Sequence, residues 1–331
     1  MRHVLIPPAL AALSPRRPTG TIHALAGQTM GTSWSVKLVG PADLPLDAVR
    51  AGVEAELDLV VAQMSTWRAD SDLSRFNAAQ AGSWHVLPAP CFTVLQGALT
   101  VAEASAGAFD PTVGPLVNLW GFGPEGARGT LPTAAELDAA RARCGWQRLT
   151  VDAPARRVQQ PGGLYLDFSG IAKGYGADRV AAWLHANGLI HHLVEVGGEL
   201  VGHGMKPDVQ PWWVALEQPP GATLAQYVVA LHGVAVATSG DYRRSFEHAG
   251  RHYAHTLDPR SGEPVLDAPA SVTVLHADCM LADAWATALT VLGTEAGMQL
   301  AAAQGLAALF ITRNAAGYTQ HLTPTLESWL E

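Results

Sequence analysis

Apolar residues recur every three or four positions in several stretches of this 331-residue chain, and a helix gathers such residues on one face. This spacing predicts helices over residues 46–64, 91–106, 134–144, 172–187 and 281–292. Elsewhere apolar and polar residues alternate, or short apolar runs lie between turn residues, which is typical of strands. The predicted strands are residues 33–39, 164–168, 191–196, 212–217, 227–232, 234–238 and 271–276.

The order of these elements indicates the fold class. Strands and helices are mixed without a strict strand–helix–strand repeat, which favours an α+β layered fold over a doubly wound Rossmann fold. No internal repeat or linker divides the chain, so we expect one domain over residues 21–331, and the Gly- and Pro-rich residues 111–129 are predicted to form a long loop. Residues 1–20 are expected to be a leader or unstructured segment, because Pro7 and Pro8 interrupt their apolar patch.

Composition narrows the classes of function. Hydrophobic residues make up 48% of the chain and charged residues 15%, as in a folded globular protein. The formal net charge is −8 and no Lys/Arg-rich run occurs, so nucleic acid is not expected as a partner. No stretch reaches about 18 uninterrupted apolar residues, so no transmembrane segment is expected. An anionic substrate would need its charge met locally, by helix N-termini, a few cations or a metal.

The three cysteines, Cys91, Cys144 and Cys279, lie far apart in the sequence. They form no CxxC pair, so neither a zinc site nor a disulfide framework is expected. Because no cysteine occurs before Cys91, we expect no lipid anchor on an N-terminal cysteine. A cytoplasmic and a periplasmic location both remain open.

Two patterns match known motifs in their letters only. Gly121–Gly126 has the spacing of a dinucleotide fingerprint, but its Gly- and Pro-rich surroundings do not provide the strand before it and the helix after it that the motif requires. His248, His252 and His255 have spacings that suit metal ligation. Only Glu247 offers an acidic partner beside them, so we interpret them as surface histidines.

Two segments offer groups that suit an anionic substrate. Asp167–Lys173 lies where a predicted strand leads into a predicted helix, so backbone N–H groups form an anion site there and Lys173 adds a positive charge. Asp283 and Thr287 are four residues apart in a predicted helix, so their carboxylate and hydroxyl share one face and can bind one hard cation such as Mg²⁺. Both segments also have plain structural explanations, since Asp167 can satisfy backbone donors and an acid in a first helical turn commonly interacts with the helix dipole.

Two loop residues carry weaker signals. Trp67 follows a predicted helix at the mouth of a loop, where an indole can stack on a planar ring, although a half-buried structural tryptophan fits the sequence equally well. Asp110 precedes Pro111 in a loop that the proline fixes, and its carboxylate can cap that loop.

Eight segments in one order resemble the ApbE family of flavin transferases, which use FAD and Mg²⁺. The resemblance runs from about residue 28 to residue 292, and one such motif alone would be weak evidence. The segments are MGTSWSV, MSTWRADSDLSRFN, AFDPTVGPL, LDFSGIAKGYGADRV, VEVGGEL, ATSGDYRRSF, HTLDPRSGEPV and ADAWATAL. Trp67 stands where the family often has Tyr, which keeps a stacking ring but loses a phenol.

The resemblance implies a substrate, a metal and a reaction. It places FAD contacts at Met30, Trp67, the turn of Ala108, Phe109 and Asp110, Asp167, Lys173 and Leu257. It places Mg²⁺ at the Gly170 carbonyl, Asp283 and Thr287. The implied reaction cleaves the FAD pyrophosphate, attaches FMN by a phosphoester to a Thr or Ser of a partner protein, and releases AMP.

The attacking hydroxyl needs a base, and His255 is the first candidate because an imidazole accepts a proton near neutral pH. Asp258 and Asp283 are the alternatives. With water as the acceptor, the same site would make the protein an FAD pyrophosphatase that gives FMN and AMP. Without turnover it would be a flavin-binding protein, which the presence of Asp283 and Thr287 makes the third choice.

Overall fold

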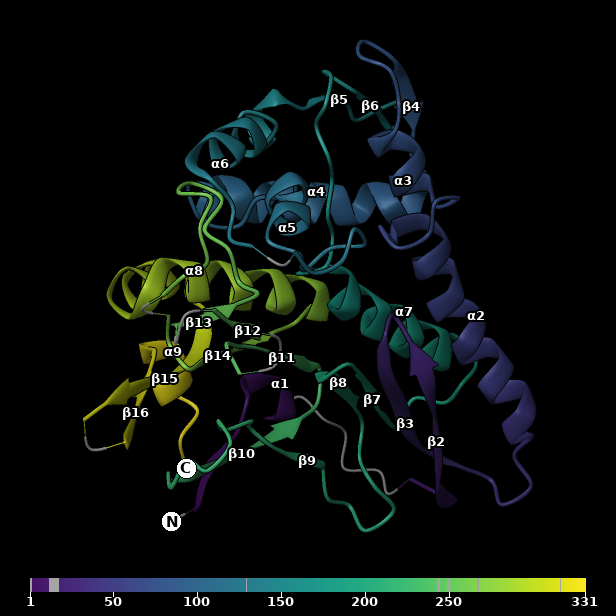
Figure 1. The fold of residues 1–331 in the computed structure, drawn as a ribbon. Helices are drawn as coiled ribbons and strands as arrows, with labels where there is room; N and C mark the ends of the chain where they lie inside the picture. Colours follow the sequence, from purple (N-terminus) through teal and green to yellow (C-terminus); the bar gives the residue numbers. More distant parts are fainter. Residues whose placement is uncertain are drawn as a thin grey trace.

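The structure, a computed structural model, describes residues 2–11, 18–128, 130–242, 245–248, 251–266, 268–315 and 317–331. Its centre is an antiparallel sheet of eight strands in the order β16-β15-β14-β11-β8-β7-β3-β2 (Figure 1). These strands are β2 (Thr21–Thr29), β3 (Thr32–Gly40), β7 (His192–Val196), β8 (Glu199–His203), β11 (Val234–Gly240), β14 (Ser271–His276), β15 (Ala307–Asn314) and β16 (Gly317–Leu322).

Helices form two layers on one side of this sheet. The long helices α7 (Ala172–Ala186) and α8 (Cys279–Ala303) pack directly on the sheet, and α2 (Leu46–Met64) and α4 (Ala89–Ala104) pack against them. Figure 1 shows α4 above α8, together with shorter helices. The shorter helices are α3 (Asp72–Asn77), α5 (Gly114–Leu119), α6 (Ala134–Arg141), a 3₁₀ turn at Trp146–Arg148 and, near the C-terminus, α9 (Pro324–Glu327).

Three small sheets surround this centre. One combines β1 (Arg2–Leu5), β10 (Gln226–Leu231) and β9 (Trp212–Ala215), and another combines β4 (Trp84–Val86), β6 (Arg157–Gln159) and β5 (Thr150–Asp152). The third is the hairpin of β12 (Ser245–His248) and β13 (Arg251–Ala254). The strand β1 pairs in parallel with β10 and is followed by α1 (Pro8–Ala11). Residues 2–11 are therefore not unstructured, because β1 pairs with β10 and α1 follows it.

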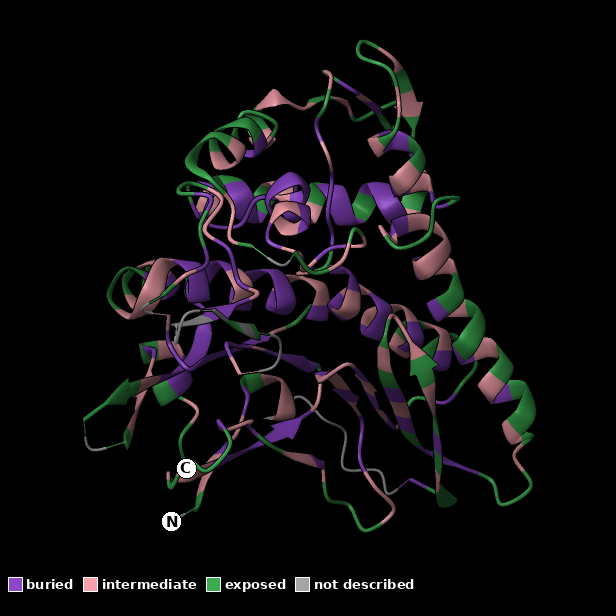
Figure 2. Ribbon diagram, in the orientation of Figure 1, coloured by how far each residue is buried: buried purple, intermediate pink, exposed green. Residues whose placement is uncertain are grey.

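The central strands have two buried faces, which explains their continuous apolar runs. In β15, Ala308 and Phe310 lie in the core cluster shared with α8, whereas Leu309 and Ile311 lie in the cluster shared with the sheet of β1, β10 and β9. Side chains alternate between the two faces of a strand, so one sequence of apolar residues serves both cores. Figure 2 shows this burial through the middle of the sheet and along α7 and α8.

The architecture is α+β and not of the Rossmann type, as predicted. The strand predicted over residues 164–168 is wrong, although this segment is buried. Side chains bond its backbone in place of a neighbouring strand: Asn77 bonds both backbone groups of Leu166, and Gln160 bonds those of Leu164. The loop predicted over residues 111–129 contains the short helix α5. Among the described residues, no helix has the length and apolarity needed to cross a bilayer.

Candidate active site

A carboxylate of α7 caps the N-terminus of α8 and so fixes the two helices relative to each other. Asp178 accepts hydrogen bonds from the backbone N–H groups of Cys279 (3.0 Å) and Met280 (2.8 Å). These are orphan donors of the first turn of α8, whose own N-cap residue makes no side-chain cap. Burial raises the pKa of Asp178 to about 7, although both hydrogen bonds oppose the shift.

The close contact of α7 with α8 depends on Gly174. A Cβ at this position would lie 2.3 Å from the carbonyl oxygen of Cys279, which no side chain can occupy without moving a backbone. The N–H of Gly174 also donates to Oδ2 of Asp283 at 3.1 Å. One residue of α7 therefore allows the contact and holds the buried carboxylate that α8 presents there.

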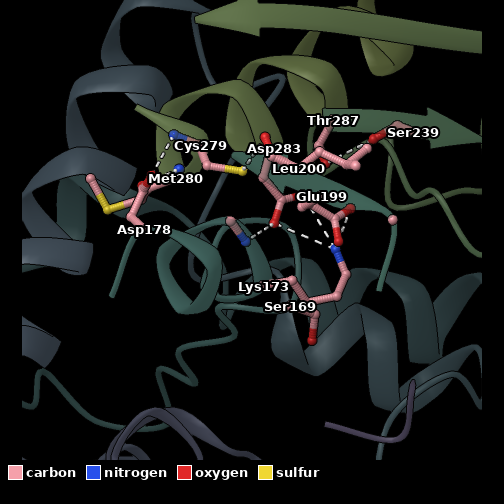
Figure 3. Close-up of polar contacts among 12 residues, drawn as sticks. Ser169, Lys173, Asp178, Glu199, Leu200, Ser239, Cys279, Met280, Asp283 and Thr287 are labelled. Atoms are coloured by element: carbon pink, nitrogen blue, oxygen red, sulfur yellow. Dashed lines mark hydrogen bonds and ion pairs between the residues drawn. The ribbon is translucent and has the colours of Figure 1, made fainter. Parts of the chain in front are cut away.

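Lys173 and Asp283 face each other across this contact (Figure 3). The Lys173 ammonium lies 3.4 Å from both carboxylate oxygens of Asp283, and the Asp283 side chain is 5% exposed. Lys173 lies in the first turn of α7, and its predicted role at an anion site stays a prediction. Its partner on α8 could not be derived from the sequence.

The other two proposed metal ligands lie beside this pair. Thr287 follows Asp283 by one turn of α8, and its Oγ1 is 3.4 Å from the hydroxyl of Ser239 on β11. A Cβ at Gly170 would be 3.1 Å from Thr287 Oγ1, so the Gly170 backbone approaches that hydroxyl closely. In the described part of the chain, no three His, Cys, Asp or Glu side chains converge as metal ligands. A cation here would therefore depend on carbonyl, hydroxyl and water oxygens as well as on Asp283.

Glu199 belongs to the same group, and sequence reasoning missed it. This residue begins β8, its side chain is 1% exposed, and its Oε1 lies 3.0 Å from the Lys173 ammonium. The segment VEVGGEL contributed to the family resemblance, but nothing in the sequence indicated which residue it would contact. The ammonium of Lys173 thus lies between two buried carboxylates.

One aromatic ring near Gly170 belongs to Phe109, in the turn of Ala108, Phe109 and Asp110. Phe109 is buried, and its ring would lie 3.3 Å from a Cβ at Gly170. The carboxylate of Asp110 stabilises its loop, because it accepts hydrogen bonds from the N–H and hydroxyl of Thr112. It also accepts one from the N–H of Trp146, which ties the loop to the 3₁₀ turn. Burial raises the pKa of Asp110, as expected for an enclosed carboxyl group.

Asp167 shapes the turn that leads to Gly170. Its Oδ1 accepts a hydrogen bond from the N–H of Ser169 at 2.7 Å, and its own N–H donates to the carbonyl of Pro111. The structure therefore shows the local backbone role that the sequence allowed for this carboxylate. Contact with FAD stays a prediction for Asp167.

Met30 lies against α7. It occupies the turn between β2 and β3 with a φ of 49°, and its Cε would be 3.1 Å from a Cβ at Gly176. Trp67 follows α2 and is 59% exposed, which leaves its indole open for stacking. Met30 thus lies beside α7 and Trp67 is exposed after α2, and contact of either residue with FAD stays a prediction.

His255 and Leu257 belong to a loop that packs on α5 and α6. Leu257 is buried in a cluster with Leu116 and Trp120, and the His255 ring meets the Phe122 ring edge-to-face at 6.3 Å between centroids. The side chains of His248 and His252 lie outside the described residues.

Comparison with known proteins assigns a family to this geometry. The profile of the ApbE family matches residues 30–310. An FAD:protein FMN transferase of Klebsiella pneumoniae is 38% identical over 332 residues, covering 99% of this chain and 95% of that protein. The crystal structure of the Pseudomonas stutzeri flavinyl transferase ApbE, apo form, matches with a TM-score of 0.86 at 42% identity, covering 93% of this chain and 96% of that one. The flavin transferase ApbE from Vibrio cholerae matches with a TM-score of 0.87 at 36% identity, covering 94% of this chain and all of that one.

Proposed function

Because this chain belongs to the ApbE family, we propose that it is an FAD:protein FMN transferase that depends on Mg²⁺. It would cleave the pyrophosphate of FAD, attach FMN by a phosphoester to a Thr or Ser of an acceptor protein, and release AMP. The observation that carries this proposal is the grouping of Gly170, Lys173, Asp283 and Thr287 where α7 meets α8. The names of the relatives support flavin transfer.

The donor atoms at this site suit Mg²⁺. A buried carboxylate, a hydroxyl and a backbone carbonyl are hard oxygen ligands, and Mg²⁺ commonly takes one or two protein groups and completes its shell with water and phosphate oxygens. The close approach of the Gly170 backbone to the side chain of Thr287 is consistent with two groups that share a ligand. Asp283, Thr287 and the Gly170 carbonyl would hold the ion, which would neutralise charge on the pyrophosphate.

The chain's own groups supply the remaining functions. Lys173 extends its ammonium from the first turn of α7, where the helix dipole also favours a negative charge, so with a divalent cation at Asp283 this end of α7 would suit an anionic pyrophosphate. Trp67 would stack on a planar ring of FAD, and Met30 would contact the flavin from the β2–β3 turn. The turn of Ala108, Phe109 and Asp110, together with Asp167 and Leu257, completes the proposed FAD contacts.

We propose His255 as the base, with Asp258 and Asp283 as the alternatives. Both oxygens of Asp258 accept hydrogen bonds from the guanidinium of Arg260, at 2.8 and 2.9 Å. Asp283 is occupied by Lys173 and Gly174. An imidazole has an ordinary pKa near neutrality, which suits it to the role of a base.

Intact-mass measurement tests the proposal. The protein is incubated with FAD, Mg²⁺ and a candidate acceptor, and the acceptor is expected to gain the mass of one FMN moiety while AMP appears. Asp283→Ala is expected to abolish this gain almost completely while FAD still binds. Release of AMP and FMN without a mass gain would indicate an FAD pyrophosphatase, and binding without either product would indicate a flavin-binding protein.

A further inference from the structure

The tight turn between β7 and β8 closes over the side chain of Lys173. Gly197 and Gly198 form this turn with φ values of 64° and 103°, which glycine adopts without strain. A Cβ at Gly197 would be 3.2 Å from Cδ of Lys173 and 3.3 Å from Oε2 of Glu199. Glu195 fixes the turn, because its Oε1 accepts a hydrogen bond from the N–H of Gly198 at 2.8 Å. Both Glu199 and the stem of Lys173 therefore lie close to this turn.

The Lys173 ammonium has two carboxylate partners at unequal distances. Glu199 Oε1 is 3.0 Å away, whereas the nearer oxygen of Asp283 is 3.4 Å away. Both carboxylates are at least nine-tenths buried, so the attraction of each for the ammonium is only weakly screened by solvent. The shorter contact is with the carboxylate that belongs to no proposed metal or substrate contact.

This arrangement contains a competition. Asp283 is the only carboxylate among the ligands proposed for Mg²⁺. If the Lys173 ammonium paired with Asp283 alone, it would compete with the cation for this carboxylate. A second buried carboxylate that also contacts the ammonium reduces that pairing. We propose that Glu199 is a positioning residue: it holds the Lys173 ammonium between two carboxylates and thereby keeps Asp283 able to bind a divalent cation.

This inference rests on the magnesium site of the proposed function, so its test measures cation binding directly. Mn²⁺ is titrated into the full chain without flavin, and the free ion is followed by electron paramagnetic resonance. Glu199→Gln is expected to weaken Mn²⁺ binding by about tenfold or more, because the ammonium loses its nearer carboxylate and pairs more strongly with Asp283. Glu195→Gln removes the same charge from the same hairpin but keeps Oε1 as an acceptor for the N–H of Gly198, so it is expected to keep the wild-type affinity.

The variant Lys173→Met separates the proposed route from a simple effect of charge. If Glu199 acts through Lys173, Glu199→Gln has no further effect on Mn²⁺ affinity in a chain that already carries Lys173→Met. If Glu199 acts on the cation through its own charge, the weakening persists in that background, and the inference is overturned. Unchanged affinity in Glu199→Gln alone overturns it as well.

Two further variants complete the test. Asp283→Ala should remove Mn²⁺ binding from the otherwise wild-type chain; binding that survives this change would contradict the magnesium site itself, a failure distinct from that of the role of Glu199. Should Glu199→Gln fail to fold, Glu199→Asp keeps the charge but shortens its reach. It is expected to weaken Mn²⁺ binding less than tenfold, and again only when Lys173 is present; a wild-type affinity in this variant would then overturn the inference.

Discussion

Gly174→Ala is expected to force α7 and α8 apart and so to damage both stability and the cation site. The added Cβ would lie 2.3 Å from the carbonyl oxygen of Cys279 and 2.9 Å from the N atom of Met280. Ordinary contacts between heavy atoms begin near 3.5 Å, so the two backbones must separate by about 1 Å. Overpacking of this kind typically destabilises a protein by about 1–3 kcal/mol.

A matched control lies two residues further along the same helix. In Gly176→Ala the new Cβ would meet only Cε of Met30 at 3.1 Å and Cδ2 of Leu57 at 3.4 Å, both ends of flexible side chains. Both variants gain the same helix propensity, about 1 kcal/mol for Ala over Gly, so this gain cancels in the comparison.

Urea unfolding measures the difference between the two variants. The free energy of unfolding of Gly174→Ala is expected to be about 1–3 kcal/mol below that of Gly176→Ala. Weaker Mn²⁺ binding should accompany it, because the N–H of Gly174 holds Asp283. Equal free energies of unfolding in the two variants would refute the claim that Gly174 sets the distance between these helices.

Three other substitutions test separate parts of the molecule. Trp67→Ala is expected to weaken FAD binding by about 1–3 kcal/mol, the range for aromatic stacking on a base, and an unchanged dissociation constant would assign Trp67 a structural role. His255→Gln should lower the rate of FMN transfer by about 10²–10⁴, with loss of the acid limb of the pH–rate profile; near-normal turnover would leave Asp258 or Asp283 as the base. Burial lowers the pKa of His192 from 6.5 to about 4, so its stabilising contribution is complete above pH 6.5 and is lost as the pH falls toward 4. The part of the free energy of unfolding that is linked to His192 should fall by up to about 3 kcal/mol across this range, so the wild-type chain should lose more stability than His192→Asn, which urea unfolding at several pH values would check.

The sequence predicted those elements whose apolar pattern has one clear period. The helix α2 begins and ends where predicted, because Val49, Val53, Leu57, Val60 and Met64 are the residues it buries. The strand β14 also matches its prediction over residues 271–276. In both cases the local pattern and the tertiary packing agree.

Two differences between the prediction and the structure depend on distant partners. Residues 164–168 have the apolar residues of a strand, but Asn77 and Gln160 take the backbone bonds that a neighbouring strand would provide. The strand β8 was not predicted, and with it the position of Glu199 was missed. The role of Glu199 follows from its ion pair with Lys173, which is 26 residues earlier in the chain and could not be assigned to it from the sequence. The cap that Asp178 places on α8 is equally long-range.

The charges around Lys173 lead to a last expectation about how FAD binds. Glu199, Asp283 and the ammonium together leave one net negative charge in a mostly buried group, which opposes an anionic pyrophosphate. A divalent cation at Asp283 would reverse that sign, so FAD should bind more tightly in the presence of Mg²⁺ than in the presence of a chelator. Fluorescence titration of FAD under the two conditions measures this. The difference should disappear in Asp283→Ala, and an FAD affinity independent of Mg²⁺ in the wild-type chain would contradict the charge argument.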